Sequence, residues 1–313
     1  MTAIRTEGLT KKYGTLTALD HLTLEVPDNV VFGFLGPNGA GKTTTVRILT
    51  GFAIPSSGSC WVAGEKVGDG NLALQAKTGL VPDVPSFYPW MSGREFLRFV
   101  GELHGLSVRE NRKRADELIE MVELKKAADR RVGGYSRGMR QRLGIAQALV
   151  NRPSVLFMDE PTSALDPIGR RDVLGLIERL AQTATIFMST HILSDVERVC
   201  SMVGIVNKGR LLTVSTVDAL REKYAPSVFE VEFLEDGSGF ASSLRSVPWI
   251  VESKVVVGNG NQKLRVRASS VDKARKELPG LIAQSGLTLC RYELVVPDLE
   301  EIFVQIVSSE AAI

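Results

Sequence analysis

The chain has 313 residues, which at roughly 150 residues per domain suggests about two domains. Its 38 basic and 36 acidic side chains leave a formal net charge of +2, which excludes binding to nucleic acid through overall electrostatic attraction. With 44% hydrophobic residues the composition is ordinary for a globular protein, and the longest apolar runs fall far short of the roughly 18 residues that span a bilayer. We therefore expect no segment that crosses a membrane.

The N-terminal residues and the cysteines both indicate the cytoplasm. The first residues carry no apolar stretch behind a basic end, so we expect no secretory signal. Three widely spaced cysteines, Cys60, Cys200 and Cys290, fit neither a disulfide framework nor a zinc site. A reducing compartment is the expectation.

In the first two thirds of the chain, apolar runs alternate with helical patterns, which is typical of a sheet wrapped by crossover helices. We predict buried strands at residues 30–35, 155–158, 185–189 and 202–207. Between residues 84 and 152 the strand pattern disappears, so we expect a mostly helical insert there.

Three helices are predicted within this insert. Ser92 and Ser107 are each followed three residues later by glutamate, which is the capping-box pattern that opens a helix. After Ser107, apolar residues recur at helical spacing and are interpreted as core. The third helix should run from Arg137 to about Val150, ahead of Pro153.

The last part of the chain predicts a second, smaller α/β domain. Residues 224–227 are typical of a linker, which places the domains at residues 1–223 and 227–313. Residues 228–234 alternate aromatic and aliphatic side chains with Glu230 and Glu232, as a half-exposed strand does. Further strands are expected near 255–257, 264–268 and 287–296, with helices near 271–285 and from Pro297.

Residues 36–43, Gly-Pro-Asn-Gly-Ala-Gly-Lys-Thr, match the phosphate-binding pattern G-x-x-x-x-G-K-[ST] between a predicted strand and helix. Backbone N–H groups of such a loop surround a phosphate, Lys42 reaches the β- and γ-phosphates, and the Thr43 hydroxyl ligates Mg²⁺. The alternative is a glycine-rich turn with a chance Lys-Thr, against which the flanking strand and helix argue. The residues expected around the phosphates are Gly36, Pro37, Asn38, Gly39, Ala40, Gly41, Lys42, Thr43 and Thr44.

An acidic pair follows the apolar run at residues 155–158. A nucleotide site needs such a pair, with Asp159 binding Mg²⁺ through water and Glu160 acting as the general base that polarises the attacking water. The alternative interpretation is a strand end with two solvated acids, which is a common arrangement.

Further segments complete a family resemblance. Residues 135–142 read Tyr-Ser-Arg-Gly-Met-Arg-Gln-Arg, residues 163–166 read Ser-Ala-Leu-Asp, His191 follows a predicted strand, and Tyr13 lies near the start. Together with the phosphate loop and the acidic pair, in this order, they resemble an ATP-binding cassette, the nucleotide-binding subunit of ABC transporters, over roughly residues 3–220. The resemblance implies an α/β P-loop NTPase fold with a helical subdomain.

The same resemblance implies roles for individual residues. Tyr13 would stack on adenine, and His191 would hydrogen-bond the γ-phosphate and hold the water near Glu160. Ser136 and Gly138 stand where the family has the serine and second glycine of Leu-Ser-Gly-Gly-Gln, whereas Arg137 and Met139 depart from that pattern. Taken alone, a histidine after a strand is more often a structural residue, and Tyr13 would more often pack than stack.

Asp83 stands where the family generally carries glutamine. A carboxylate accepts hydrogen bonds but cannot donate them, so Asp83 is expected to bind a metal-bound water in a different way. Basic residues around Ser136 are interpreted as solvated surface, with a site for membrane phosphates as the alternative. Residues 297–303, Pro-Asp-Leu-Glu-Glu-Ile-Phe, resemble a pattern in the C-terminal extension of subunits that serve export-type permeases.

The resemblance thus implies an ATPase that uses ATP and Mg²⁺, pairs head to tail with a second copy, and drives a separate transmembrane permease, in the direction of export. In such a pair, Lys42 of one copy and Ser136 of the other enclose each ATP. The subunit would be cytoplasmic, held at the inner face of the cell membrane through the permease, with no nucleic-acid partner. The alternative is a soluble cassette ATPase acting on nucleic acid or the ribosome. Such proteins usually carry coiled-coil or zinc insertions, or two cassettes, and neither is visible here.

A GTPase is a further rival. Residues 207–210, Asn-Lys-Gly-Arg, imitate the start of the guanine-binding pattern Asn-Lys-x-Asp, but Arg210 occupies the place of the aspartate.

Overall fold

The computed structural model describes residues 2–68, 70–163, 165–224, 228–258, 261–295 and 298–310. The chain divides into two compact units, one of residues 1–217 with 306–313 and one of residues 218–305. The domain limits expected from the sequence stay a prediction, because residues 225–227 of the expected linker lie outside the described ones. Among the described residues, no helix combines the length and the apolar character needed to cross a bilayer.

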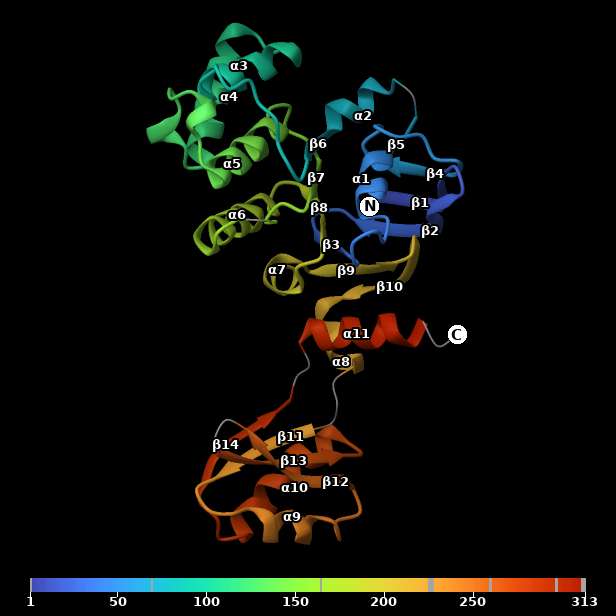
Figure 1. Ribbon diagram of the computed structural model, residues 1–313, viewed down its shortest axis with the longest axis vertical. Helices are drawn as coiled ribbons and strands as arrows, with labels where there is room; N and C mark the ends of the chain where they lie inside the picture. The colour runs from blue at the N-terminus through green and yellow to red at the C-terminus, as the bar shows by residue number, and fades with distance from the viewer. Residues whose placement is uncertain are drawn as a thin grey trace. The chain divides into compact units, whose positions relative to one another are not determined.

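The first unit is built on a six-stranded sheet in the order β10-β9-β3-β8-β7-β6 (Figure 1). Its strands are β3 (Val31–Leu35), β6 (Thr78–Val81), β7 (Val155–Asp159), β8 (Thr185–Thr190), β9 (Met202–Asn207) and β10 (Arg210–Thr216). Neighbouring strands are parallel except β9 and β10. Every residue of β3, β7 and β8 is buried, as in sheets covered on both faces. The four predicted strands are confirmed within one residue at their ends, whereas β6 and β10 were missed.

A second, antiparallel sheet in the order β2-β1-β4-β5 was also missed. Its strands are β1 (Thr2–Tyr13), β2 (Leu16–Pro27), β4 (Ser57–Val62) and β5 (Glu65–Lys66). Register shifts between β1 and β2 place adjacent residues such as Ala3 and Ile4 on the buried side together. These irregularities destroy the simple alternation by which a strand is recognised in a sequence.

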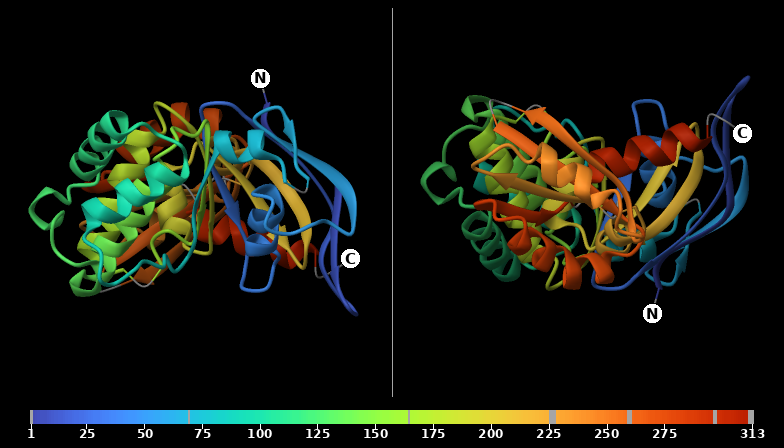
Figure 2. Two further views of the ribbon diagram at one scale, coloured as in Figure 1. Left: turned by 90° about the horizontal axis from the view of Figure 1, so that it is seen from above. Right: turned by 90° about the horizontal axis from the view of Figure 1, so that it is seen from below.

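Helices cover the central sheet. They include α1 (Lys42–Leu49), α2 (Leu72–Lys77), α6 (Pro167–Leu180) and α7 (Leu193–Val199), and α8 (Val217–Tyr224) follows β10. The predicted helical insert contains α3 (Gly93–Leu103), α4 (Val108–Met121) and α5 (Arg137–Ala148), with short 3₁₀ turns at Lys125–Ala127 and Val132–Gly134. Figure 2 shows α3, α4 and α5 gathered on the side of the parallel sheet opposite the antiparallel sheet.

Details of the insert follow the sequence closely. Both predicted capping boxes are confirmed, with Ser92 capping α3 and Ser107 capping α4. Helix α5 ends at Ala148 rather than near Val150, because the N–H groups of the next two residues bond three residues back and tighten the last turn.

The second unit is a four-stranded antiparallel sheet in the order β12-β13-β11-β14. It contains β11 (Val228–Phe233), α9 (Ser238–Leu244), β12 (Ile250–Gly258), β13 (Asn261–Ala268), α10 (Val271–Gln284) and β14 (Leu289–Leu294), and α11 (Leu299–Glu310) begins in it. The small α/β unit agrees with the sequence, although α9 was missed and the predicted start at Pro297 lies outside the described residues. The expectation that Glu230 faces solvent was wrong: it is only 8% exposed, because Lys263 and Arg265 pair with it.

Candidate active site

The loop at residues 36–43 joins β3 to α1, as its sequence predicts. Gly39 and Gly41 have φ angles of 80° and 104°, which glycine adopts without strain. A Cβ atom on Gly36 would lie 2.4 Å from the carbonyl oxygen of Val206, and one on Gly41 would lie 2.6 Å from that of Ala18. The glycines are therefore required by close backbone approach as well as by conformation.

A cleft of about 630 Å³ opens beside this loop, a volume within the usual range for small-molecule sites. It collects side chains from both sheets of the first unit. Nine of the predicted site residues line it: Tyr13, Asn38, Gly39, Gly41, Lys42, Thr43, Thr44, Asp83 and Glu160. Residues far apart in the sequence thus meet around one volume.

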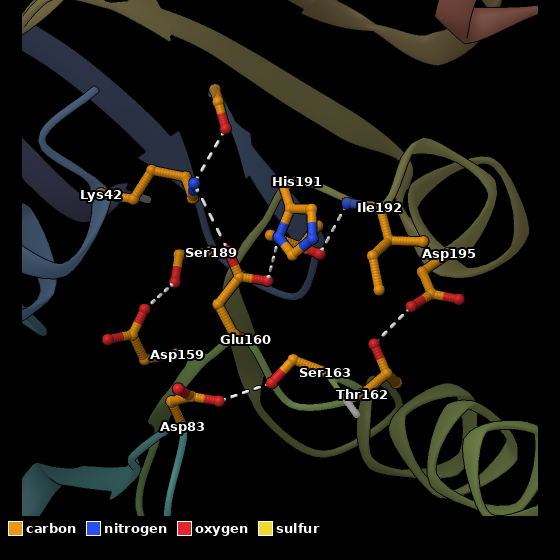
Figure 3. Close-up of polar contacts among 12 residues, drawn as sticks. Lys42, Asp83, Asp159, Glu160, Thr162, Ser163, Ser189, His191, Ile192 and Asp195 are labelled. Carbon is orange, nitrogen blue, oxygen red and sulfur yellow. Dashed lines mark hydrogen bonds and ion pairs between the residues drawn. The ribbon is translucent and has the colours of Figure 1, made fainter. Parts of the chain in front are cut away.

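Lys42 is buried, with 6% of the residue exposed. Its Nζ atom donates hydrogen bonds to the carbonyl oxygens of Gly36, at 2.8 Å, and Pro37, at 3.3 Å. It also lies 3.4 Å from Oε1 of Glu160. The loop lysine therefore pairs with the carboxylate predicted to be the general base (Figure 3).

Glu160 lies between two partners. Its second carboxylate oxygen, Oε2, is 2.9 Å from Nδ1 of His191, which comes from the loop after β8. The backbone of Glu160 is left-handed, with φ of 49°, a conformation that costs free energy for a side chain other than glycine. The carboxylate points from the end of β7 toward Lys42 and His191, as Figure 3 shows.

Asp159 precedes Glu160 and is 7% exposed. The hydroxyl of Ser189 on β8 donates a hydrogen bond to its Oδ1 atom. Asp159 is not among the residues that line the cleft in the described part of the chain. Its carboxylate is held at the end of β7 by Ser189.

Asp83 follows β6 and is held by the loop after β7. Its Oδ1 atom accepts a hydrogen bond of 2.5 Å from the hydroxyl of Ser163. The predicted segment at residues 163–166 thus contributes Ser163 to this contact, while Ala164 lies outside the described residues. A glutamine at position 83 would accept the same hydrogen bond through its amide oxygen.

Ser136 and Gly138 stand apart from this constellation. Both lie at the start of α5, where the Ser136 hydroxyl accepts a hydrogen bond from the N–H of Met139 and caps the helix. Among the described residues that line the cleft, neither appears. Ser136 is exposed, so one copy of the chain does not bring this pair to its own cleft.

Four residues that line the cleft were not expected from the sequence. Leu16, Thr17, Ala18 and Lys208 also line the cleft. Lys208 and Gly209 form the tight turn between β9 and β10 with positive φ angles, and the N–H of Gly209 donates to the carbonyl oxygen of Ala40. Residues 207–209, Asn-Lys-Gly, are typical of a tight turn, although above they were compared only with a guanine-binding pattern.

A buried network behind the site was missed as well. Asp195, 1% exposed, accepts hydrogen bonds from the hydroxyl of Thr162 and from Nε of Arg170, the latter at 2.6 Å. It joins the loop after Glu160 to the helix that follows His191. No spacing rule connects these three residues in the sequence.

Comparison with known proteins decides the family. The sequence profile of the ABC transporter family matches residues 19–163. The uncharacterized ABC transporter ATP-binding protein YxlF of Bacillus subtilis (strain 168) is 38% identical over 301 residues, covering 96% of this chain and 98% of that protein. The chain belongs to the ATP-binding subunits of ABC transporters.

Other relatives agree. The bacitracin transport ATP-binding protein BcrA of Bacillus licheniformis is 34% identical to this ATP-binding subunit, covering 98% of it and 97% of BcrA. A solved ATP-binding subunit of an ABC transporter superposes with a TM-score of 0.64 at 28% identity, over 71% of this chain and 93% of that one. The dimeric bacterial ABC transporter cassette MJ0796 gives a TM-score of 0.62 at 25% identity, over 68% and 98%.

The ATP-binding subunit therefore hydrolyses ATP and energises a separate membrane permease. The predicted fold class, an α/β P-loop NTPase cassette, is confirmed. The alternative of a soluble ATPase that acts on the ribosome or nucleic acid is not favoured.

Replacing His191 by alanine is expected to lower ATP turnover roughly a hundredfold, with a smaller loss of ATP affinity, because the ring holds Glu160, the carboxylate expected to act as the general base. Steady-state phosphate release and nucleotide binding measure the two effects. His104→Ala, in the helical insert, is the matched control and should leave basal turnover unchanged. Equal turnover in both variants would return His191 to a structural role.

Proposed function

We propose that two copies of this subunit pair head to tail and enclose two ATP molecules, each between the loop of one copy and Ser136 and Gly138 of the other. This proposal rests on the observation that, within one copy, the residues of the cleft and the start of α5 lie apart. Lys42 and Glu160 line the cleft and His191 contacts Glu160, whereas Ser136 is exposed at the start of α5. The N-terminus of α5 offers its partial positive charge to a phosphate supplied by another molecule.

The contacts of Lys42 suggest how nucleotide starts the reaction. In this structure its ammonium group pairs with Glu160. The phosphates of ATP carry more negative charge than one carboxylate, so Lys42 would turn to them and release Glu160. Glu160 then accepts a proton from the water that attacks the γ-phosphorus, and ADP leaves with the bridging oxygen.

Magnesium fits the oxygen donors present. Thr43 lines the cleft and Asp159 ends β7, and a hydroxyl with a carboxylate suits a cation that keeps several waters. Bound Mg²⁺ would neutralise charge on the phosphates. Asp83 is the third candidate and would act through a water.

We further propose export as the direction of transport and the cytoplasmic face of the membrane as the location. The similarity to BcrA, a bacitracin transport ATP-binding protein, and to the Nod factor export ATP-binding protein I supports this direction. Copurification of the full chain with a polytopic membrane protein tests the proposal. Stable association with ribosomes or DNA in its place would overturn it.

Asp83 offers a sharper test with the permease present. Asp83→Ala should weaken the Mg²⁺ dependence and the permease-stimulated ATPase rate more than the basal rate, because hydrolysis keeps Glu160. Asp83→Gln should be tolerated, since its amide oxygen still accepts from Ser163. Ser163→Ala separates the loss of this hydrogen bond from the loss of the carboxylate. An unchanged Mg²⁺ titration and stimulation in Asp83→Ala would make Asp83 a loop residue only.

A further inference from the structure

The sheet of the second unit has one face covered by α9 and α10 and one charged face, and Glu301 of α11 lines a pocket with residues of the charged face. Helices α9 and α10 pack their apolar residues against Phe229, Val231, Leu264 and Val266, and Figure 1 shows both helices on the same side of the sheet. Side chains alternate along a strand, so the residues between these point to the other face. We call this other side the open charged face; it consists of Glu230, Glu232, Glu252, Lys254, Lys263, Arg265, Arg267, Arg291 and Glu293.

Charge is divided across this face. The half formed by β11 and β14 carries three acids and one base, with Glu230 and Glu232 at its centre. The half formed by β13 and β12 carries four bases and one acid, with Lys263 and Arg265 at its centre. In the β11–β13 register Glu230 lies opposite Arg265 and Glu232 lies opposite Lys263. The boundary between the two signs therefore runs along the line between β11 and β13.

The charges are held in place within one copy. Glu230 lies 2.6 Å from Arg265 and 3.2 Å from Lys263, and Glu232 lies 3.2 Å from Lys263. Burial acts to raise the pKa of Glu230, but its hydrogen bonds to Arg265 and Lys263 outweigh burial and hold that pKa below its usual range. About half of the Arg265 side chain remains exposed. The face is thus ordered and ionised at neutral pH, with Glu230 buried between its two partners and Arg265 about half exposed.

We propose that the open charged face pairs with the same face of a second copy, about a two-fold axis that runs parallel to the strands between β11 and β13. This rotation lays the acidic half of each copy on the basic half of the other. Glu232 of one copy then faces Lys263 of the second copy, and Glu230 faces Arg265. A surface divided into opposite signs along one line is complementary to itself in this orientation, as a symmetric interface requires.

The area of the face sets the strength of this pairing. Four strands about 4.8 Å apart, with about six residues each, cover roughly 400 Å² per copy, or about 800 Å² in total, which is below the ~1,200 Å² of stable interfaces. We expect a dissociation constant of roughly 10–100 µM without nucleotide.

Two single charge reversals test the orientation. In the proposed pairing, position 232 of one copy faces position 263 of the other. Glu232→Lys therefore sets two bases against each other between copies, and Lys263→Glu sets two acids against each other. Each variant should repel a copy of itself. An equal mixture places the two bases of one copy against the two acids of the other. Each reversal also breaks the pair within its own copy, and mixing does not repair that pair, so rescue on mixing reports only contact between copies.

Association of the full chain is measured without nucleotide by sedimentation equilibrium up to about 100 µM, and by native mass spectrometry of copies with tags of different mass. Each single variant should associate at least about tenfold more weakly than the natural sequence, and the mixture should recover to within about threefold, as heterodimers. Lys276→Glu, exposed on α10, is the matched control and should change nothing. A monomeric natural chain, no rescue in the mixture, or equal weakening by Lys276→Glu would each overturn the proposal.

This outcome is independent of the proposed head-to-tail cassette pair. That pair requires ATP, whereas the open charged face is tested without it. If ATP does not induce pairing but mixing the two charge variants restores association, only the head-to-tail arrangement is rejected. If ATP induces pairing but mixing the two charge variants does not restore association, only the pairing of the open charged face is rejected.

Discussion

Lys42→Ala is expected to abolish most ATP binding and hydrolysis. The ammonium group sits buried at the loop, held by the carbonyl oxygens of Gly36 and Pro37, from where it reaches the phosphates of a nucleotide. Two charge-assisted hydrogen bonds of about 2 kcal/mol each correspond to between about a hundredfold and a thousandfold in affinity. Titration with a fluorescent ATP analogue and steady-state phosphate release measure the effect.

The control for this variant lies on the same helix. Arg47 is exposed on α1, so Arg47→Ala removes a positive charge without touching the cleft and should bind ATP normally. Circular dichroism checks that Lys42→Ala folds. Near-normal affinity and turnover in a folded Lys42→Ala would contradict the assignment of the loop.

Glu160→Gln is expected to separate binding from chemistry. The amide keeps the shape of the side chain and accepts a hydrogen bond, but it cannot take the proton of the attacking water. Turnover should fall between about a hundredfold and ten-thousandfold, while ATP still binds. The nucleotide-bound dimer should then accumulate, which light scattering with and without ATP detects. Glu178→Gln, on the exposed side of α6, serves as the control.

Gly138 tests the orientation of that dimer. A Cβ atom at Gly138 would meet its nearest neighbour, the Cα atom of Gly169, at 3.8 Å, so the fold has room for a side chain. Gly138→Asp, added to Glu160→Gln, would set a negative charge against the phosphate of the second copy and should abolish the ATP-dependent dimer without reducing ATP binding by the monomer. Gly138→Ala is the milder companion. A dimer that persists with Gly138→Asp would contradict the head-to-tail arrangement.

Local features were predictable from the sequence because they depend on a few consecutive residues. The loop needs glycines at fixed places, a capping box needs Ser and Glu three residues apart, and a buried strand needs an apolar run. Each of these occurs where predicted, at residues 36–43, at Ser92 and Ser107, and in β3 and β7. The sheet of β1 and β2 was not predictable in this way, because its register shifts erase the alternation that identifies a strand.

What the sequence determined by itself is the set of chemical groups and their order along the chain, and with them the cassette family. What only the tertiary structure decided is which groups meet. The ends of parallel strands converge at one edge of a sheet, which brings Glu160 within 3.4 Å of Lys42 and 2.9 Å of His191. The second sheet adds Tyr13 to the same cleft, and long-range contacts bury Asp195 and Glu230 beside cations. Such distances depend on how segments that are 31 or more residues apart in the sequence pack together, and no local pattern encodes that packing.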